Sequence, residues 1–502
     1  MPRTLAELVE EAGARDEPGF NDPRGPAPGG VDPLGLRQIN FQLMDQVFPG
    51  VNNVARHIRP FVVVTWAWRR AAQLALSAGL SPAPTDLLRD FVDRIEVIYA
   101  WSQFVLAPAA DLPGRDVLAQ ILQSGGYVFE GGEWETRRDT RRYSTAFSAP
   151  INYGPALRAL GWLEPAEDGS GALKASAAAG PALDALEERM AAYLDHPAFS
   201  SFGRVDVSQA DVRVWSEAWR LDDPSDAEKA VAAELLAGPS ANPRRAAGVA
   251  LACAAFGASG DPEARSVRRA MSGPPSNFVA PTELANTMAM WRKVQVRQVL
   301  RLALEALFAW SVDRLGIAPR PTAALVQAFL SAPGIPAAAS TREWLGQGQA
   351  NSGPVEHLEA LEMALQARDR SEVPAAVLGA IAFCLAEAPA ASESFEAAER
   401  LPLSVAARQA SGFLDAPPSA FLRHMFEAWL FGQHTYWSIG RGLADARAQG
   451  KTLLRLRVVM DEGGWTLTPG AAAPTPLATA DRLATILALA GESGLLAAQA
   501  SA

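Results

Sequence analysis

The chain has 502 residues, of which 49% are hydrophobic and 20% are charged, and its formal net charge is -10 at pH 7. This composition predicts a globular protein and excludes disordered and collagen-like chains. At about 100–200 residues per domain, the length predicts roughly three to four domains or subdomains. With 2 cysteines, the chain is neither a disulfide scaffold nor a cysteine-rich zinc module. The negative charge argues against non-specific coating of nucleic acid, but it is compatible with a local basic patch.

The sequence predicts a cytoplasmic protein that begins with a flexible arm. Met1–Glu10 lacks the apolar stretch of a secretory signal peptide. The longest apolar runs, 61–68 and 375–386, fall short of the roughly 20 residues that span a bilayer, so we expect buried helices and no membrane partner. Residues 1–31 are expected to form the arm, because 12–33 is rich in glycine, proline and aspartate.

Residues 32–135 are expected to form an N-terminal helical domain. Apolar residues recur with helical spacing over three stretches: 34–48, 54–77 and 85–107. Pro49 is expected to end the first helix and Pro60 to interrupt the second.

The segment 136–200 is expected to be winged-helix-like. It has the pattern of a helix, a strand, a turn rich in glycine and acidic residues, a second strand and a second helix, over 151–160, 161–164, 166–171, 173–176 and 181–194. This order is typical of a winged helix, in which the turn forms the wing. Many winged helices bind DNA, and many others only hold subunits together.

Residues 201–400 are expected to form a central helical domain. Its candidate helices are 208–220, 225–237, 243–257, 282–315, 322–331, 355–367 and 373–386. The longest of them, 282–315, is expected to run through the middle of this domain.

Residues 401–502 change character again. We expect an aromatic-rich helix over 418–444, a β-hairpin over 453–467 with a glycine-containing loop, and a closing helix over 480–490. The predicted fold class is therefore mainly α: a multi-subdomain helical protein with winged-helix-like segments and a C-terminal β-hairpin.

No motif in the sequence predicts a catalytic residue, a cofactor or a metal ligand. Gly450-Lys451-Thr452 is not a P-loop, because a predicted helix precedes it and a predicted strand follows it. His424 and His434 would lie about 80° apart around one helix, which is poor geometry for a shared metal ion.

One acidic cluster is a candidate for binding a divalent ion. It consists of Glu130, Glu133, Glu135 and Asp139. Paired carboxylates of this kind are what a metal-dependent nuclease needs. The alternative is that Gly131 and Gly132 form a hairpin turn and that the acids are solvated.

Two sets of basic residues are candidates for contact with nucleic acid or with a protein partner. The first set is Arg137, Arg138, Arg141 and Arg142, and the second is Arg292, Lys293, Arg297 and Arg301. Guanidinium groups suit phosphate, and residues four apart share one face of a helix. Alternatively, the first set pairs with the acids at 130–135, and the second pairs with Glu305 and other acids.

Two stretches resemble a known group of proteins. Residues 32–68 contain a D-x-L-G turn, a helix, an F-P-G stop, and then a helix with arginines and Trp66. Residues 424–467 contain an aromatic helix with Gln-His, an R-L-R strand and an acidic glycine turn. This pattern resembles uncharacterised bacterial proteins encoded in phage-defence and restriction gene clusters.

The resemblance implies an accessory or sensor component that acts with a helicase, nuclease or ATPase encoded nearby. It carries over no catalytic residue. Within the matching stretch, Arg56 and Arg59 are three residues apart and are expected to project together, where they would bind phosphate or cap neighbouring carbonyls.

The leading hypothesis is a non-enzymatic scaffold or DNA-associated accessory subunit of a bacterial anti-phage defence system. Its basic sets would contact DNA or a protein partner from the same gene cluster. One alternative is a metal-dependent nuclease or other hydrolase centred on the acidic cluster. A third hypothesis is a pure protein-interaction module with no affinity for nucleic acid.

Overall fold

The computed structural model describes residues 32–80, 82–132, 134, 153–167, 171–259, 261, 263–316, 318–348, 352–391, 400–449 and 456–500. Over these residues the protein is mainly helical, with strands only in three antiparallel pairs, which confirms the predicted mainly α class. The predicted arm, 1–31, lies outside the described residues.

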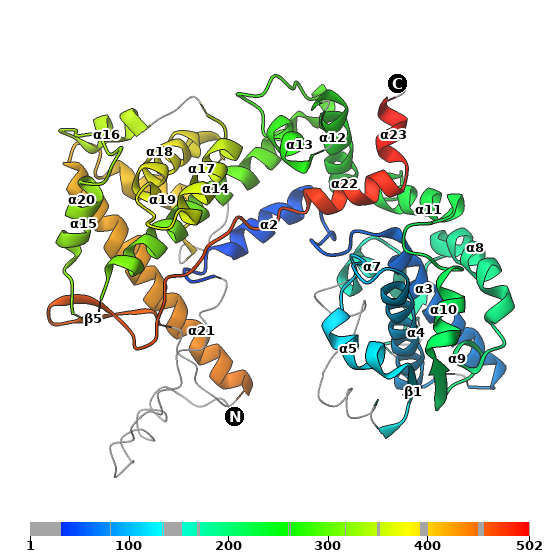
Figure 1. Cartoon of the computed structure of the whole chain (residues 1–502). Coiled ribbons are helices and arrows are strands. Elements are labelled where there is room, and N and C mark those ends of the chain that lie inside the picture. The colour runs from blue at the N-terminus through cyan, green and yellow to red at the C-terminus, as the bar shows by residue number, and fades with distance from the viewer. Residues whose placement is uncertain are drawn as a thin grey trace, which may run out of the picture. The chain divides into compact units, whose positions relative to one another are not determined.

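The chain forms two compact units, each assembled from stretches that are distant in the sequence (Figure 1). The first unit takes its residues from Met1–Leu43, Ser272–Asn277 and Ala289–Thr479. The second takes them from Met44–Met271, Phe278–Met288 and Ala480–Ala502. Each unit thus joins stretches that are distant in the sequence.

The first unit is built around the long helix α14. Its elements are α14 (Ala285–Arg314), α15 (Thr322–Leu330), α16 (Thr341–Gly348), α17 (Pro354–Gln366), α18 (Val373–Ala391), α19 (Leu403–Ser411), α20 (Pro418–His424), the π-helical segment η5 (Met425–Gly432), α21 (Gln433–Gln449), β5 (Val458–Asp461) and β6 (Gly464–Leu467). Helices α2 (Arg37–Val47) and α14 contribute residues to both units.

Helix α14 is buried continuously from Val294 to Val312. A helix that is buried on all sides must be surrounded by other elements. Apolar residues of α15, α17, α18 and α19 belong to the same buried cluster as those of α14. The predicted helix 282–315 is thus present and is a core helix of the first unit.

The predicted C-terminal hairpin is present as β5 and β6. Val458 lies opposite Leu467, and Asp461 lies opposite Gly464 at the turn. Gly464 has a φ of 131°, and a Cβ at this position would lie 2.4 Å from the Arg320 carbonyl oxygen. Only glycine allows this close approach.

One described helix, α18, is long and apolar enough by length and composition to cross a bilayer. Of its most apolar window, 56% is buried inside the protein. Helices α16, α17 and α19 pack against it.

The second unit contains the remaining elements. They are α3 (Ile58–Ser77), α4 (Thr85–Leu106), α5 (Arg115–Ser124), β1 (Gly126–Phe129), α7 (Gly154–Ala159), β2 (Leu163–Pro165), β3 (Leu173–Ala175), η1 (Ala177–Ala179), α8 (Gly180–Met190), η2 (Ala191–Tyr193), α9 (Pro197–Ser200), β4 (Val205–Ser208), α10 (Gln209–Ser216), α11 (Asp226–Ala237), α12 (Pro243–Ser259), α13 (Ala264–Met271), η3 (Thr282–Leu284), α22 (Leu483–Glu492) and α23 (Leu495–Ala500).

Helices α3 and α4 pack against each other and form the centre of the second unit. Helix α3 begins at Ile58, so Pro60 lies in its first turn and does not interrupt it, contrary to the sequence expectation. Proline is tolerated there because the first amide groups of a helix have no partner within the helix.

The order of elements predicted for 151–194 is present as α7, β2, β3 and α8. Strands β2 and β3 are antiparallel, with Leu163 opposite Ala175. Both β3 and α8 pack on α3. The segment is therefore built onto the core of the second unit.

Strand β1 pairs with β4, which is distant in the chain. The antiparallel register places Tyr127 opposite Val207 and Val128 opposite Asp206. The turn expected at Gly131 and Gly132 therefore does not connect β1 to its partner strand.

In the first unit, His434 joins three segments. Its exposed fraction is 1%. Nδ1 donates to the Pro33 carbonyl oxygen at 2.8 Å, and Nε2 accepts from the Arg457 N–H at 2.9 Å. Burial lowers the pKa of His434 to about 4, although the bond to Pro33 acts in the opposite direction.

This geometry predicts a pH-dependent stability. Since the folded pKa lies below the ordinary value, the stabilisation is fully present above about pH 6.5 and is lost as the pH falls toward 4, by on the order of 3 kcal/mol. We expect His434→Gln to remove this part of the pH dependence when urea unfolding is measured across that range. Equal pH slopes for the variant and the wild type would contradict the assignment.

Helix α12 provides a matched pair of glycines for testing its packing. A Cβ at Gly248 would lie 2.5 Å from the Val47 carbonyl oxygen, whereas a Cβ at Gly257 meets no described atom within 4 Å. We expect Gly248→Ala to destabilise the protein by about 1–3 kcal/mol. We expect Gly257→Ala to be neutral or to stabilise it by up to about 1 kcal/mol, measured by thermal or urea unfolding. Equal effects at the two positions would contradict the packing of α12.

Candidate functional site

Two arginines expected to face a polyanion are fully buried in the first unit. Arg297 donates to the carbonyl oxygens of Leu401 at 2.6 Å and Arg400 at 3.0 Å. Arg301 pairs with Glu305 at 2.5 Å and donates to the Leu477 carbonyl oxygen at 2.7 Å. Their expected role in binding nucleic acid or a partner is therefore wrong, because α14 is enclosed where they lie.

The other two members of this set lie nearer the start of α14. Arg292 forms two hydrogen bonds to Glu387, at 2.7 and 2.9 Å, and also donates to the Ser272 carbonyl oxygen at 2.6 Å. Lys293 is half-buried. The expected basic stripe along α14 is not formed, because three of its four members are used inside the protein.

Arg56 and Arg59 also have internal partners. Arg59 is fully buried, and its Nη1 lies 2.9 Å from Oε1 of Glu228, which is also fully buried. Arg59 also donates to the Asp223 carbonyl oxygen, so of the two expected roles it is the bond to a carbonyl that the structure shows. Arg56 is 43% exposed, donates to the Asn53 carbonyl oxygen at 3.3 Å and lies 3.5 Å from Asp111.

The remaining sequence candidates fall mostly outside the described residues. These are Arg137, Arg138, Arg141, Arg142, Glu133, Glu135 and Asp139. Glu130 is described, and its carboxylate accepts from Arg94 at 3.1 Å. Within the described part of the chain, no group of three or more His, Cys, Asp or Glu residues is placed to hold a metal ion.

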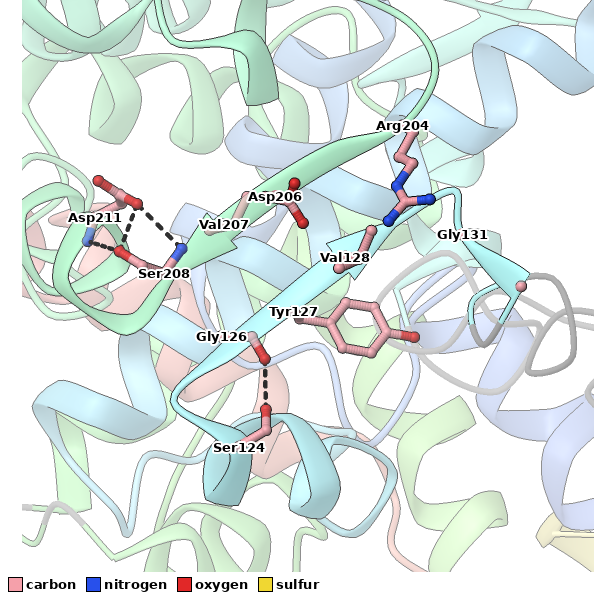
Figure 2. A pocket seen from close by; sticks show the side chains of 11 residues that line it. Ser124, Gly126, Tyr127, Val128, Gly131, Arg204, Asp206, Val207, Ser208 and Asp211 are labelled. Carbon is pink, nitrogen blue, oxygen red and sulfur yellow. Dashed lines mark hydrogen bonds between the residues drawn. The ribbon is translucent and has the colours of Figure 1, made fainter.

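The site that emerges instead is a cleft of about 670 Å³ over the β1–β4 pair of the second unit. We call it the β1–β4 cleft (Figure 2). Its lining residues are Ser124, Gly126, Tyr127, Val128, Gly131, Gly132, Arg204, Asp206, Val207, Ser208 and Asp211. A volume of several hundred Å³ matches that of a ligand-binding site.

The alternation of residues along β4 separates a buried face from an exposed face. Val205 and Val207 are buried, whereas Arg204 and Asp206 are exposed. On β1, Tyr127 and Phe129 are buried, and both rings contact Trp134 in edge-to-face geometry. Apolar side chains on the buried face thus hold the strand pair in place. The charged side chains of Arg204 and Asp206 are exposed.

Arg94 holds the chain at one end of the cleft. It is fully buried on α4 and pairs with Glu130, the residue after β1. It also donates to the carbonyl oxygens of Ser201 at 2.5 Å and Gly203 at 3.0 Å, just before β4. Burial lowers the pKa of Arg94 to about 10, so it remains charged at neutral pH. One guanidinium group therefore ties both strands at the end where Arg204 lies.

A capping box fixes the other end. Ser208 Oγ donates to Asp211 at 2.6 Å and accepts from the Asp211 N–H at 3.2 Å, at the start of α10. The hydroxyl bond from Ser208 lowers the pKa of Asp211, which keeps this carboxylate ionised. Nearby, Ser124 Oγ donates to the Gly126 carbonyl oxygen at 2.6 Å.

The lining therefore combines opposite charges, small residues, two valines and one tyrosine. Arg204 contributes a cation, and Asp206 and Asp211 contribute anions. Serine and glycine leave room above the strands. Such a surface can bind a ligand that carries both charges and presents hydrogen-bonding groups.

Sequence reasoning missed this site. The alternation Val205-Asp206-Val207 is a strand signal, but it is only a few residues long. Its partner, β1, lies far away in the chain, so no local pattern predicts the cleft.

Comparisons with protein-family models, with curated proteins and with solved structures find no match to this chain.

The buried pair Arg59–Glu228 allows a direct test of the structural role assigned to these arginines. We expect Arg59→Met to destabilise the protein by about 3–5 kcal/mol, because it leaves Glu228 buried without its charge partner. The double variant Arg59→Met/Glu228→Gln should recover part of that loss in urea unfolding.

The control is Arg56→Met, which removes a partly exposed arginine of the same segment and should change stability by less than about 1 kcal/mol. A small effect of Arg59→Met combined with a loss of DNA affinity would contradict the structural role.

Proposed function

We propose that this chain is a non-enzymatic scaffold protein that binds a polypeptide segment of a partner at the β1–β4 cleft. The observation that carries the proposal is the pair of exposed, oppositely charged side chains of Arg204, which immediately precedes β4, and Asp206, which lies on β4. A polypeptide supplies side chains of both signs together with backbone donors and acceptors.

Nucleic acid fits the cleft less well. A phosphate backbone carries only negative charge, and its binding depends on neutralisation by lysine and arginine. The cleft places Asp206 and Asp211 beside its one described arginine, and these carboxylates would repel phosphate. The arginines on α14 do not compensate, because Arg297 and Arg301 are buried.

The proposed setting is the cytoplasm and an anti-phage gene cluster. It is supported by the resemblance of residues 32–68 and 424–467 to proteins of such clusters. In this setting the partner is an ATPase, helicase or nuclease encoded nearby. The winged-helix-like segment α7–α8 belongs to the proposal as a structural part of the second unit, because its second strand and second helix are packed on α3.

If the protein also contacts DNA, the proposed contact residues are Arg137, Arg138, Arg141 and Arg142. These four lie outside the described residues. The nuclease alternative loses support at Glu130, whose carboxylate is engaged by Arg94.

The proposal predicts that the purified full-length chain enriches a set of peptides from a random peptide library. Val128→Arg, which places a large cation on the floor of the cleft, should weaken binding of the enriched peptides at least about tenfold. Fluorescence anisotropy measures the affinities.

Val214→Arg on α10 is the matched control, because Val214 is 54% exposed and does not line the cleft, so this variant should bind like the wild type. Duplex and single-stranded DNA are titrated in parallel. Salt-dependent DNA binding that is lost in Val128→Arg, with no peptide enrichment, would contradict the proposal.

A further inference from the structure

Building on the proposed function, we propose that the β1–β4 cleft selects an extended polypeptide segment in which an acidic residue and a basic residue are separated by one residue. The acidic side chain would lie against Arg204 and the basic side chain against Asp206. This inference adds the charge pattern of the ligand, which the proposed function leaves open.

The spacing of the two charges supports an extended ligand. Asp206 lies on the exposed face of β4, and Arg204, two residues earlier, immediately precedes the strand and is also exposed. A strand rises about 3.4 Å per residue, so their Cα atoms are separated by about 7 Å along β4. An extended peptide has the same repeat, which places its residues i and i+2 in register with the two charges.

The opposite strand, β1, supplies an apolar neighbour for Asp206. Val128 is the direct partner of Asp206 and is half-buried. Figure 2 shows Arg204, Asp206 and Val128 around the cleft, with Ser208 and Asp211 toward one end and Gly131 toward the other. The floor thus offers an apolar contact beside Asp206.

The small residues make room for a peptide backbone. A Cβ at Gly132 would meet no described atom within 4 Å, and a Cβ at Gly126 would come no nearer than 3.5 Å to the Val207 carbonyl oxygen. The lining serines and glycines therefore do not obstruct an extended chain lying over the strands.

Both charges stand on a fixed base. The Arg94 bonds to Ser201 and Gly203 hold the chain before Arg204. The capping bond between Ser208 and Asp211 holds the chain after Asp206. Charges on a rigid frame lose less entropy on binding and discriminate better between ligands than charges on a loop.

The test is an exchange of the two charges, Arg204→Asp/Asp206→Arg, in the full-length chain. The probes are short synthetic peptides that are glycine- and serine-rich except for a Glu and a Lys two positions apart. One peptide has Glu before Lys, a second has Lys before Glu, and a third has Gln at both positions.

We expect the wild type to prefer one order over the other by roughly tenfold at low salt, and the exchanged variant to prefer the opposite order. This inversion does not depend on which way the peptide runs across the cleft. The preference should shrink as salt is added, because exposed charges are screened.

The neutral variant Arg204→Gln/Asp206→Asn is the control and should show no preference between the two orders. Both positions are exposed, so both double variants should unfold at the wild-type temperature, as checked by circular dichroism.

The outcomes distinguish failure of the charge pattern from failure of peptide binding at the cleft. Enriched library peptides that bind the wild type without any preference for charge order would overturn the charge pattern and leave the proposed function intact. Absence of binding by the library and by all three designed peptides would overturn both. DNA binding that is lost in Arg204→Asp and strengthened in Asp206→Arg would replace the polypeptide with a polyanion.

Discussion

Buried guanidinium groups that donate to backbone carbonyls hold irregular segments against the helices in both units. In the second unit, Arg245 donates to the carbonyl oxygens of Leu235, Leu236, Pro49 and Ala159. Arg94 ties the ends of β1 and β4, and in the first unit Arg297 ties the loop at 400–401 to α14. A buried carbonyl without a donor costs about 1–3 kcal/mol, so one arginine that satisfies several carbonyls replaces several separate partners.

This use of arginine changes the functional interpretation. Arginine-rich stretches in a sequence suggest phosphate contacts, but Arg59, Arg297 and Arg301 are buried and bind groups inside the protein. The charge that remains available around the β1–β4 cleft is mixed in sign, with Arg204 beside Asp206. The same Arg94 that satisfies loop carbonyls also places these two side chains on a fixed strand pair. The candidate site therefore depends on the internal hydrogen bonds of Arg94.

The sequence patterns located many of the helices correctly and misjudged the contacts between them. The range 85–107 matches α4 closely, and 282–315 contains α14. Helices α13 and α19 were not expected, because each is only 8 or 9 residues long, too short to repeat a helical pattern of apolar residues. The interpretation of Arg297 and Arg301 failed for a different reason: residues four apart do share a helix face, but nothing local reveals that other helices cover that face.

The amino-acid sequence by itself determined the mainly α class, the long helix α14 and the hairpin β5–β6, because helical and strand periodicity and glycine turns act over a few residues. Only the tertiary structure decided which charged side chains are buried, how the chain divides into two units, and that β1 pairs with β4. These features arise from contacts between stretches far apart in the chain, and a side chain's burial depends on what distant residues place over it.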